Sequence, residues 1–289
     1  MFLAHPAGRG VPGSDRYTST LPLWDDCLMT NRIELAQVIV VLPTYNEIGT
    51  LEAVVAGVTA HGYRLLIVDD ASPDGTGALA DRLSRSQPLV SVLHRPAKEG
   101  LGPAYAAGFA AALATGPEIV CQMDADLSHD PAQLPDLVAA VGAGADLAIG
   151  SRLGPGGAIV DWPRWRRLLS RWGNRYARFA LGIPHRDLTS GFRGFRSPAL
   201  AVLDPGSARA NGYCFQIEMA WRAHAAGLDI IEVPITFTER RSGSSKLGGG
   251  IVAEAMWLVT RWGIARRLGR ATPVRTQNGR PATEEEGLK

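Results

Sequence analysis

Cysteine, net charge and long apolar runs are all scarce in this sequence of 289 residues. Its three cysteines, Cys27, Cys121 and Cys214, stand far apart and form no CxxC pair, which argues against a zinc site or a disulfide framework and favours a reducing compartment. A net charge of +2 gives no sign of a general nucleic-acid-binding surface. No window reaches the roughly 18 consecutive apolar residues of a membrane-spanning helix, so any membrane contact is expected to be peripheral.

The two ends of the sequence lack the patterning of folded elements. Residues 1–34 carry scattered Pro and Gly without the apolar run of a signal sequence, and we predict a disordered leader there. Met29 stands just before the first patterned segment, so the natural start could lie at that residue. Residues 271–289, with three consecutive glutamates, are predicted to form a disordered tail. Residues 35–270 remain as a single predicted domain.

Apolar residues make up 46% of the chain, enough to fill a sizeable core. Between residues 37 and 150, apolar runs alternate with Gly- or Pro-marked turns and Ala/Leu-rich segments, the pattern of βαβ units. The predicted strands cover residues 37–42, 64–68, 90–93, 119–123 and 147–149. The predicted helices begin near residues 50, 75, 103, 131 and 163, the last three at a proline.

Beyond residue 150 the pattern loosens. We predict a Gly-rich loop over 153–157, a basic helix, a turn-rich stretch to about 212, a helix over 215–226, a strand over 229–237 and a last helix over 250–268. The last helix carries an apolar stripe that either packs on the core or lies on a bilayer surface. The fold class is therefore α/β, with a Rossmann-like, mostly parallel sheet flanked by helices.

Polar residues directly after the strands are the first candidates for a ligand site, because open α/β sheets bind ligands beyond the carboxyl ends of their strands. Glu47 follows the first strand and Asp70 the second, where a carboxylate can accept hydrogen bonds from a base or a ribose hydroxyl. Asn46, Ser72 and Asp74 suit helix caps and turns as well as ligands. No Gly-rich phosphate loop follows the first strand.

The strongest local signal is the run from Asp124 to Asp126 at the end of the fourth predicted strand. Two carboxylates one residue apart can approach a divalent cation that bridges the phosphates of a nucleotide, and Mg²⁺ is usually held by one or two carboxylates together with substrate oxygens and water. An ordinary Asp-rich turn is the alternative, but the position at a strand end favours the metal. His129, three residues further on, is expected to be a turn residue.

Cations gather in two segments of the second half. Arg152 ends the fifth strand, and the basic helix that follows interleaves six arginines, Arg166 among them, with tryptophans that include Trp162. Such a helix is either a solvated amphipathic face, a phosphate grip or an anionic lipid interface; no nucleic-acid module surrounds it. Arg240 and Lys246 lie on a Gly/Ser-rich loop that could close over phosphates. The turn over residues 187–193 cannot be interpreted alone.

Taken together, six motifs resemble the inverting family 2 glycosyltransferases of GT-A fold, most closely the polyprenyl- or dolichyl-phosphate mannose synthases. The likeness covers roughly residues 37–262 and holds in chain order. The motifs are PTYNE (43–47), VDDASPDGT (68–76), DADLSH (124–129), GSR (150–152), DLTSGFR (187–193) and RxxGxSK (240–246).

This resemblance implies roles for individual residues. Those expected to hold the guanine nucleoside are Pro43, Tyr45, Glu47, Val68 and Asp70. Those expected at the diphosphate, sugar and metal are Asp124, Ala125 and Asp126, with Arg240 and Lys246 on the phosphates from the loop. Arg152 and Arg166 would grip the acceptor phosphate. Some relatives carry an amide metal ligand where this chain has Ser128.

The function that the resemblance implies is transfer of mannose from GDP-mannose to a polyprenyl phosphate with inversion, using Mg²⁺ or Mn²⁺. Asp124, Asp126 and Arg152 are the predicted catalytic residues, and no strong general base is required because a lipid phosphate is already ionised at neutral pH. Many relatives append transmembrane helices. Because this sequence has no spanning segment, we expect peripheral contact on the cytoplasmic face of a membrane, assisted by a separate membrane protein. Nucleic acid is not an expected partner.

Two other readings stay open. The same fold could move glucose from UDP-glucose to the lipid phosphate, since no base-reading residue settles the donor. The chain could also be a nonenzymatic nucleotide-sugar-binding protein, although the Asp124/Asp126 pair and the set of cations argue against it. A nicotinamide dehydrogenase is a poor third, because Gly100 and Gly102 are followed by Tyr105 where the dinucleotide fingerprint needs glycine.

Overall fold

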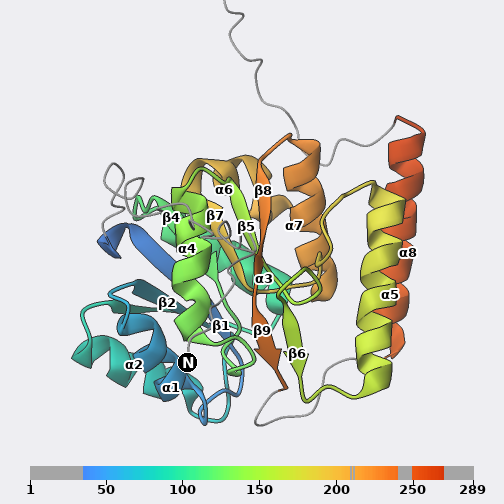
Figure 1. Cartoon of the computed structure of the whole chain (residues 1–289). Coiled ribbons are helices and arrows are strands. Elements are labelled where there is room, and N and C mark those ends of the chain that lie inside the picture. Colours follow the sequence, from blue (N-terminus) through green and yellow to red (C-terminus); the bar gives the residue numbers. More distant parts are fainter. Residues whose placement is uncertain (1–34, 209, 211, 240–248, 270–289) are drawn as a thin grey trace, which may run out of the picture. The chain divides into compact units, whose positions relative to one another are not determined.

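A seven-stranded, mostly parallel sheet forms the centre of the described part of the chain, in the order β3-β2-β1-β4-β7-β5-β8 (Figure 1). The computed structural model describes residues 35–239, except 209 and 211, and residues 249–269. The predicted leader and tail lie outside these residues. The loop with Arg240 and Lys246 also lies outside them. None of the described helices combines the length and apolar character needed to cross a bilayer.

The five strands predicted from apolar runs are all present, with ends that lie within two residues of the predicted ones. They are β1 (Val38–Thr44), β2 (Arg64–Asp69), β3 (Val90–His94), β4 (Ile119–Gln122) and β5 (Leu147–Ser151). Every residue of β1 is buried, because helices cover both faces of the sheet. Ile39 and Val41 join one apolar cluster, whereas Val40 and Leu42 join the other.

The turn-rich stretch predicted up to residue 212 is partly wrong, because it contains a short strand and a helix. Strand β7 (Arg193–Arg196) inserts antiparallel between β4 and β5, and α6 (Ser197–Leu203) follows it. The sequence RGFR has a single large apolar residue, Phe195, so no periodic pattern marks it. Backbone pairing with two neighbouring strands, rather than local preference, makes this segment a strand.

The predicted strand over 229–237 is in fact two strands in two sheets. Strand β8 (Ile230–Pro234) pairs parallel with β5 at the sheet edge, whereas β9 (Thr236–Thr238) pairs with β6 (Ala158–Val160). The chain changes sheets at Ile235, whose N–H donates to the carbonyl of Ser151 and whose carbonyl accepts from Ala158. The small sheet thereby ties the loop after β5 to the end of β8.

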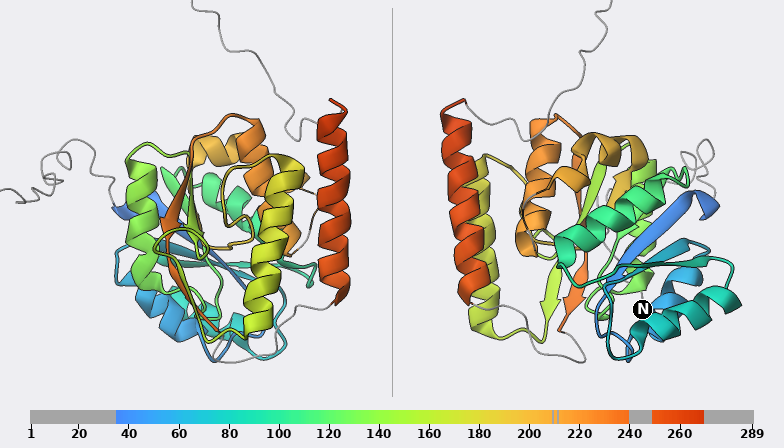
Figure 2. Two further views of the ribbon diagram at one scale, coloured as in Figure 1. Left: turned by 45° about the vertical axis from the view of Figure 1, so that its right-hand side comes forward. Right: turned by 180° about the vertical axis from the view of Figure 1, so that it is seen from behind.

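Helices pack on both faces of the main sheet, as predicted (Figure 2). One side carries α1 (Leu51–Thr59), α2 (Thr76–Ser86) and α4 (Leu134–Gly142). The other carries α3 (Leu101–Leu113), α6 and α7 (Tyr213–Ala225). Helix α3 begins two residues before the predicted Pro103, and Pro131 opens a short 3₁₀ turn that leads into α4.

Two long helices, α5 (Arg164–Leu181) and α8 (Gly249–Arg267), lie side by side beyond α7 (Figures 1 and 2). Val259 of α8 is buried, and Trp262 stacks on Trp221 of α7 at a ring-centroid distance of 5.4 Å. Trp257 and Ile264 of α8 remain exposed. The last helix therefore packs on the core with one part of its surface and leaves another part uncovered.

Candidate active site

The predicted site residues of the first half gather where β1, β2 and β4 end, at the carboxyl edge of the parallel part of the sheet. Pro43 pairs with Val68 in the register of β1 and β2, and both residues are buried. Tyr45 and Glu47 follow directly after β1, and Asp70 after β2. The five residues predicted around a nucleoside therefore occupy adjacent positions.

The loops after β1 and β2 are tied to each other by hydrogen bonds. The backbone N–H of Asn46 donates to Ser72 Oγ at 3.2 Å, that of Glu47 to Thr76 Oγ1 at 3.0 Å, and that of Ile48 to Asp74 at 3.3 Å. Ser72 and Asp74 therefore stabilise the turns, one of the two roles that the sequence left open for them. Their contacts hold the segment that carries Tyr45 and Glu47 in place.

Two cations at this edge had not been expected from the sequence. Arg95, just after β3, pairs with the buried Asp70 and with Glu99. The ammonium of Lys98 lies 3.6 Å from the centre of the Tyr45 ring, a cation–π contact. Only the order of the strands brings the segment after β3 beside the segment after β1, so no local pattern marks these partners.

The carboxylates of Asp124 and Asp126 differ in exposure. The Asp124 side chain is 28% exposed, whereas Asp126 is 6% exposed, with Oδ1 accepting the backbone N–H of Ser128 at 3.0 Å. Between them and Ser128, Leu127 adopts a left-handed backbone with φ of 59°, which a branched side chain rarely does. The strained turn presents both carboxylates at the end of β4.

Asp124 is oriented from three directions. The hydroxyl of the buried Tyr105 on α3 donates to Asp124 Oδ1 at 3.0 Å. The backbone N–H of Asp124 donates to His129 Nδ1 at 3.4 Å. A Cβ on Gly191 would lie 3.1 Å from Asp124 Oδ2, so the loop before β7 approaches this carboxylate closely. Tyr105 was missed, although it is the one polar side chain in the apolar helix α3.

His129 is a buried, neutral part of the framework. Its ring stacks on Phe192 at a centroid distance of 5.0 Å and meets Phe237 edge-on. Burial lowers the pKa of His129 from its ordinary value, and this outweighs the opposite effect of the nearby Asp124 and Asp126. Because its Nδ1 accepts a hydrogen bond, the proton of the neutral ring belongs on Nε2.

The donors around Asp124 suit a hard divalent cation. No group of three or more His, Cys, Asp or Glu side chains that could hold a metal occurs among the residues that the structure describes. Mg²⁺ needs only one or two carboxylates when substrate oxygens and water complete its octahedron. The hydroxyl of Ser128 is buried and has no hydrogen-bond partner within the described part, so it offers a further oxygen beside the two carboxylates.

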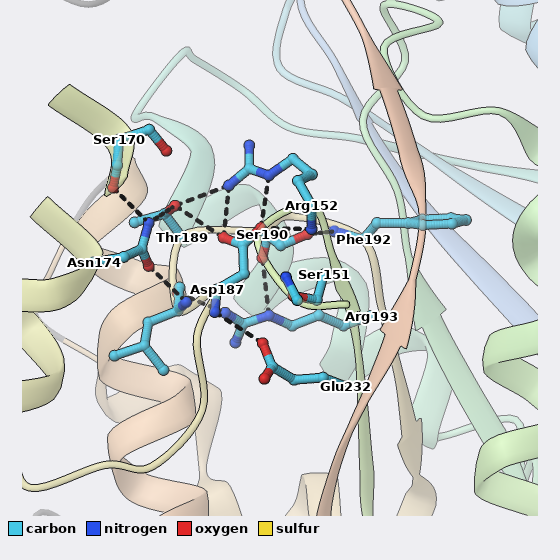
Figure 3. Close-up of polar contacts among 12 residues, drawn as sticks. Ser151, Arg152, Ser170, Asn174, Asp187, Thr189, Ser190, Phe192, Arg193 and Glu232 are labelled. Carbon is cyan, nitrogen blue, oxygen red and sulfur yellow. Dashed lines mark hydrogen bonds and ion pairs between the residues drawn. The ribbon is translucent and has the colours of Figure 1, made fainter. Parts of the chain in front are cut away.

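Arg152 at the end of β5 is clamped by Asp187, a contact that explains the turn over residues 187–193 (Figure 3). Its Nε donates to Asp187 Oδ2 and its Nη2 to Oδ1, both at 2.7 Å, and its backbone N–H donates to Oδ2 at 2.9 Å. Nη2 also donates to Thr189 Oγ1 at 2.9 Å. Among the residues that the structure describes, the hydrogen bonds of the Arg152 side chain use Nε and Nη2, which leaves Nη1 to meet an anion.

Asp187 is fully buried and ionised. Burial by itself would raise the pKa of Asp187, but the charge of Arg152 and the hydrogen bonds from Arg152 and Thr189 outweigh it and hold that pKa below its ordinary value. A carboxylate held in this way is a poor proton acceptor. Its place in the site is that of a fixed counter-charge which orients Arg152.

The loop around Asp187 is held by further buried hydrogen bonds (Figure 3). Asn174 of α5 donates to Thr189 Oγ1 at 3.0 Å and accepts from the N–H of Leu188 at 2.7 Å. The guanidinium of Arg193 donates to the carbonyls of Ser190 and Leu188. Burial lowers the pKa of Arg193 to about 9, which still leaves it protonated at neutral pH.

Arg166, the second predicted acceptor-side arginine, is brought close to Arg152 through Trp162. The guanidinium carbon lies 4.1 Å from the Trp162 ring centre for Arg166 and 5.7 Å for Arg152. Nη1 of Arg166 donates to both oxygens of Glu239, at 2.6 and 2.7 Å. Glu239 was not among the predicted residues, because nothing in its own segment indicates a partner 73 positions away.

Both arginines border an apolar, partly open cavity of about 120 Å³ that is lined mainly by α5, α7 and α8. Its lining includes Trp172 and Ala177 of α5, Ile217 of α7, and Met256 and Val259 of α8. A mainly apolar cavity with two cations in its lining suits an anion that carries an apolar chain. The structure thus brings Arg152 and Arg166 to one cavity, while Arg240 and Lys246 lie outside the described residues.

The family model described as "Glycosyl transferase family 2" matches residues 39–203, more than half of the chain. The chain belongs to glycosyltransferase family 2. The carboxylates at the strand ends thus stand in the catalytic domain of a glycosyltransferase. The expected α/β class, with its GT-A nucleotide-sugar transferase fold, is confirmed.

Two curated relatives resemble this glycosyltransferase over most of its length. The polyprenol monophosphomannose synthase of Mycolicibacterium smegmatis is 50% identical over 240 residues, which cover 82% of this chain and 90% of that protein. The undecaprenyl-phosphate mannosyltransferase of Micrococcus luteus is 47% identical over 233 residues, which cover 80% and 96%.

Solved structures share the fold at lower identity. Glucosyl-3-phosphoglycerate synthase from Mycobacterium tuberculosis, in complex with Mn²⁺ and UDP, superposes with a TM-score of 0.55 at 23% identity, covering 81% of this chain and 79% of that one. A mannosyltransferase from Pyrobaculum calidifontis, in complex with GDP-Man and Mn²⁺, gives a TM-score of 0.52 at 18% identity, covering 85% and 69%. These similarities show the fold alone.

Proposed function

We propose that this glycosyltransferase moves mannose from GDP-mannose to a polyprenyl phosphate and releases polyprenyl-phosphate β-mannose. The observation that carries the proposal is the apolar cavity that Arg152 and Arg166 help to line. A lipid phosphate has the two parts that this cavity matches, an anion and a hydrocarbon chain. The names of the two curated relatives support both the sugar and the lipid.

Arg152 and Arg166 hold the acceptor phosphate in this proposal. Asp187 and Glu239 fix the two guanidinium groups before the acceptor arrives, which lowers the cost of ordering them. Each arginine is already paired with one carboxylate, so the remaining positive field is moderate. A phosphate bound there keeps part of its negative charge, so its oxygen remains nucleophilic.

The donor occupies the edge formed by the ends of β1, β2 and β4. Pro43, Tyr45, Glu47, Val68 and Asp70 take the nucleoside, while Asp124, Ala125 and Asp126 face the diphosphate and the sugar. Arg240 and Lys246 close on the phosphates from their loop. The nearness of the first group to Asp124 across neighbouring strands supports this assignment.

Asp124 and Asp126 would hold Mg²⁺ or Mn²⁺, with the hydroxyl of Ser128 as a further oxygen donor. A bound divalent cation would neutralise charge that develops on the leaving diphosphate. Tyr105 and Ser128 N–H keep the two carboxylates in place. Residues 35–270 act as one catalytic domain in this scheme.

The chemical step needs no strong base from the protein. An oxygen of the lipid phosphate, ionised at neutral pH, attacks the anomeric carbon of mannose while the bond from that carbon to the diphosphate breaks. In-line attack inverts the configuration, and GDP leaves with the bonding electrons. Asp187 is not a candidate base, because its carboxylate is buried against Arg152 and the pKa of Asp187 is lowered.

Contact with the membrane is peripheral in this proposal and takes place on the cytoplasmic face. A lipid acceptor has to enter from a bilayer, and its cavity lies between α5 and α8, which expose Trp165, Phe179 and Trp257. Aromatic residues beside arginines favour the headgroup region. A separate membrane protein would supply any firmer anchor.

A transfer assay tests the proposal and separates it from the glucosyl alternative. Purified protein is mixed with polyprenyl phosphate in detergent and with radiolabelled GDP-mannose or UDP-glucose, with and without EDTA, and label is followed into organic-extractable lipid. We expect label from GDP-mannose only, lost with EDTA and in Asp126→Ala. Label from UDP-glucose alone would refute the mannosyl assignment, and transfer that survives EDTA would refute the metal.

A further inference from the structure

A second cationic feature lies outside the acceptor cavity and has no part in the reaction described above. An open recess of about 380 Å³ is lined by Leu153, Arg171, Arg175, Arg178 and Arg186. Three of these arginines lie on α5 at positions i, i+4 and i+7, which share one helix face. Leu153 comes from the loop after β5 and Arg186 from the loop after α5.

The recess has an unbalanced positive charge. Its lining contains four arginines and no acidic residue. Within the described part of the chain, none of the ion pairs involves Arg171, Arg175, Arg178 or Arg186, whereas Arg152, Arg166, Arg196 and Arg222 each face a carboxylate. Nε of Arg178 is buried without a hydrogen-bond partner among the described residues. Four like charges around one hollow repel each other unless an anion lies between them.

The recess is built from the same segments as the acceptor site. Leu153 directly follows Arg152, and Arg186 directly precedes Asp187, so the recess adjoins the ion pair that orients the acceptor arginine. Helix α5 lines the recess with Arg171, Arg175 and Arg178, and it lines the acceptor cavity with Trp172 and Ala177. An anion in the recess would therefore bind within one helix width of the acceptor.

Exposed aromatic residues accompany the arginines along α5. Trp172 and Phe179 occupy the positions immediately after Arg171 and Arg178, and both are exposed. Successive residues of a helix point about 100° apart, so an aromatic row runs beside the cationic row. This pairing of aromatic and guanidinium rows favours a bilayer interface, where rings enter the headgroup layer and cations meet phosphates.

We infer that the four-arginine recess binds the phosphate headgroup of an anionic phospholipid, next to the site of the lipid acceptor. Its charge and its open form suit a phosphodiester, and its neighbouring aromatic residues suit the surrounding lipid. The bound headgroup turns α5 toward the bilayer and brings the mouth of the acceptor cavity to the lipid surface. The benefit to acceptor entry rests on the proposed function, whereas the binding of the headgroup does not.

Vesicle sedimentation with the full chain tests the recess without any donor or acceptor. The vesicles are pure phosphatidylcholine, or phosphatidylcholine mixed with phosphatidylglycerol. We expect binding to the mixed vesicles only. Each arginine near an anionic surface contributes roughly fivefold to the affinity, so Arg171→Gln with Arg175→Gln should weaken binding about 25-fold.

Two matched controls separate the recess from charge in general. Arg82→Gln with Arg85→Gln removes the same charge from exposed positions on α2, and Arg164→Gln removes one exposed charge from α5 outside the recess. We expect the α2 pair to bind vesicles like the wild type, and Arg164→Gln to weaken binding less than Arg171→Gln. If Arg164→Gln and Arg171→Gln weakened vesicle binding equally, the proposed headgroup site would be wrong, and binding would come from a diffuse basic face.

Competition with other anions tests whether the recess prefers a lipid headgroup. Inorganic phosphate should displace the mixed vesicles only weakly if the lipid is the ligand, and full displacement at low concentration would assign the recess to free phosphate. Preferential binding of single-stranded RNA over mixed vesicles would also overturn the inference. Transfer to polyprenyl phosphate in detergent should be unchanged in the Arg171/Arg175 variant, so a failure of the proposed function and a failure of the recess give different results.

Discussion

At the scale of single residues, the pair of Arg152 and Asp187 combines two buried charges that depend on each other. Both side chains are buried, and the carboxylate accepts three hydrogen bonds from one arginine. Removing one partner from a buried pair leaves an uncompensated charge and costs about 3–5 kcal/mol. The pair should therefore control both stability and the geometry of the acceptor arginine.

The first prediction concerns Asp187→Asn. Because the pKa of Asp187 is lowered in the folded protein, its charge stabilises the fold above the unfolded pKa of about 3.9, and this stabilisation is lost as the pH falls through the folded pKa. We expect the variant to lose about 3–5 kcal/mol of unfolding free energy at neutral pH. Below about pH 4 its stability should decline less steeply than that of the wild type. Urea unfolding over a pH series measures both.

Asp146→Asn is the control for this experiment. Asp146 pairs with Arg196 at 3.5 Å and is partly exposed, so its ion pair is expected to contribute at most about 1 kcal/mol. Asparagine also keeps an oxygen that can accept the hydrogen bond from Asp229 N–H. Equal destabilisation of the two variants would show that the buried pair contributes no more than a surface one.

The second prediction concerns Tyr105→Phe, which removes the hydroxyl that orients Asp124. Loss of a partner that positions a metal ligand typically weakens metal binding about 10–100-fold. We expect such a loss in calorimetric titration of Mn²⁺ in the presence of GDP, with little change in thermal unfolding. Tyr63→Phe makes the same change at another buried tyrosine, distant in sequence from the carboxylate turn. Unchanged Mn²⁺ affinity in Tyr105→Phe would contradict the orienting role.

At the scale of elements, the contact between α5 and α8 shapes the acceptor cavity. Gly263 of α8 faces α5 so closely that a Cβ would lie 2.8 Å from the carbonyl oxygen of Ala180. Gly173 of α5 has open space where its Cβ would be. Two helical glycines thus have opposite surroundings, and only one of them is required by packing.

The third prediction follows from this difference. Gly263→Ala should lower the free energy of unfolding by about 1–3 kcal/mol, because the helices must separate to admit the methyl group. Gly173→Ala should raise it by about 0.5–1 kcal/mol, since alanine loses less backbone entropy than glycine in a helix. Urea denaturation of the two variants measures both effects. A stabilised Gly263→Ala would mean that α8 does not pack on α5 as closely as described.

At the scale of the whole molecule, exposed aromatic residues concentrate on α5 and α8. Trp165, Trp172 and Phe179 of α5 and Trp257 of α8 are all more than half exposed. Arginines accompany them, since Arg261 lies over Trp257 and Arg267 over Phe179. Such a surface supports the proposed peripheral contact with a membrane.

The fourth prediction tests that surface. Phe179 is 73% exposed and Val202 of α6 is 51% exposed, so both can be changed to serine with little effect on the core. Partial burial of a phenyl ring in the headgroup layer contributes about 1 kcal/mol or more, so Phe179→Ser should weaken vesicle binding by roughly fivefold. Val202→Ser should bind like the wild type. If the two variants bound vesicles equally well, the membrane contact would not involve Phe179.

Much of the fold and part of the site could be predicted from the sequence. Four of the first five strands are almost entirely buried, because helices cover both faces of the sheet, and their apolar runs make them visible without neighbours. Only β3, at the edge of the sheet, is mostly less buried. Position at a strand end then singles out Asp70, Asp124 and Arg152, since ligands meet α/β sheets there. Composition and spacing along one chain suffice for these inferences.

Other features were decided only by the tertiary structure. The strand β7 exists because β4 and β5 both offer it hydrogen bonds, and its own four residues give no periodic signal. Asp187 reaches Arg152 over 35 positions, and Glu239 reaches Arg166 over 73. Tyr105 meets Asp124 only because α3 packs under the end of β4. The sequence by itself determined the first five strands and where their reactive ends lie. The pairing of side chains across those ends depends on strand order and helix packing, which no local pattern encodes.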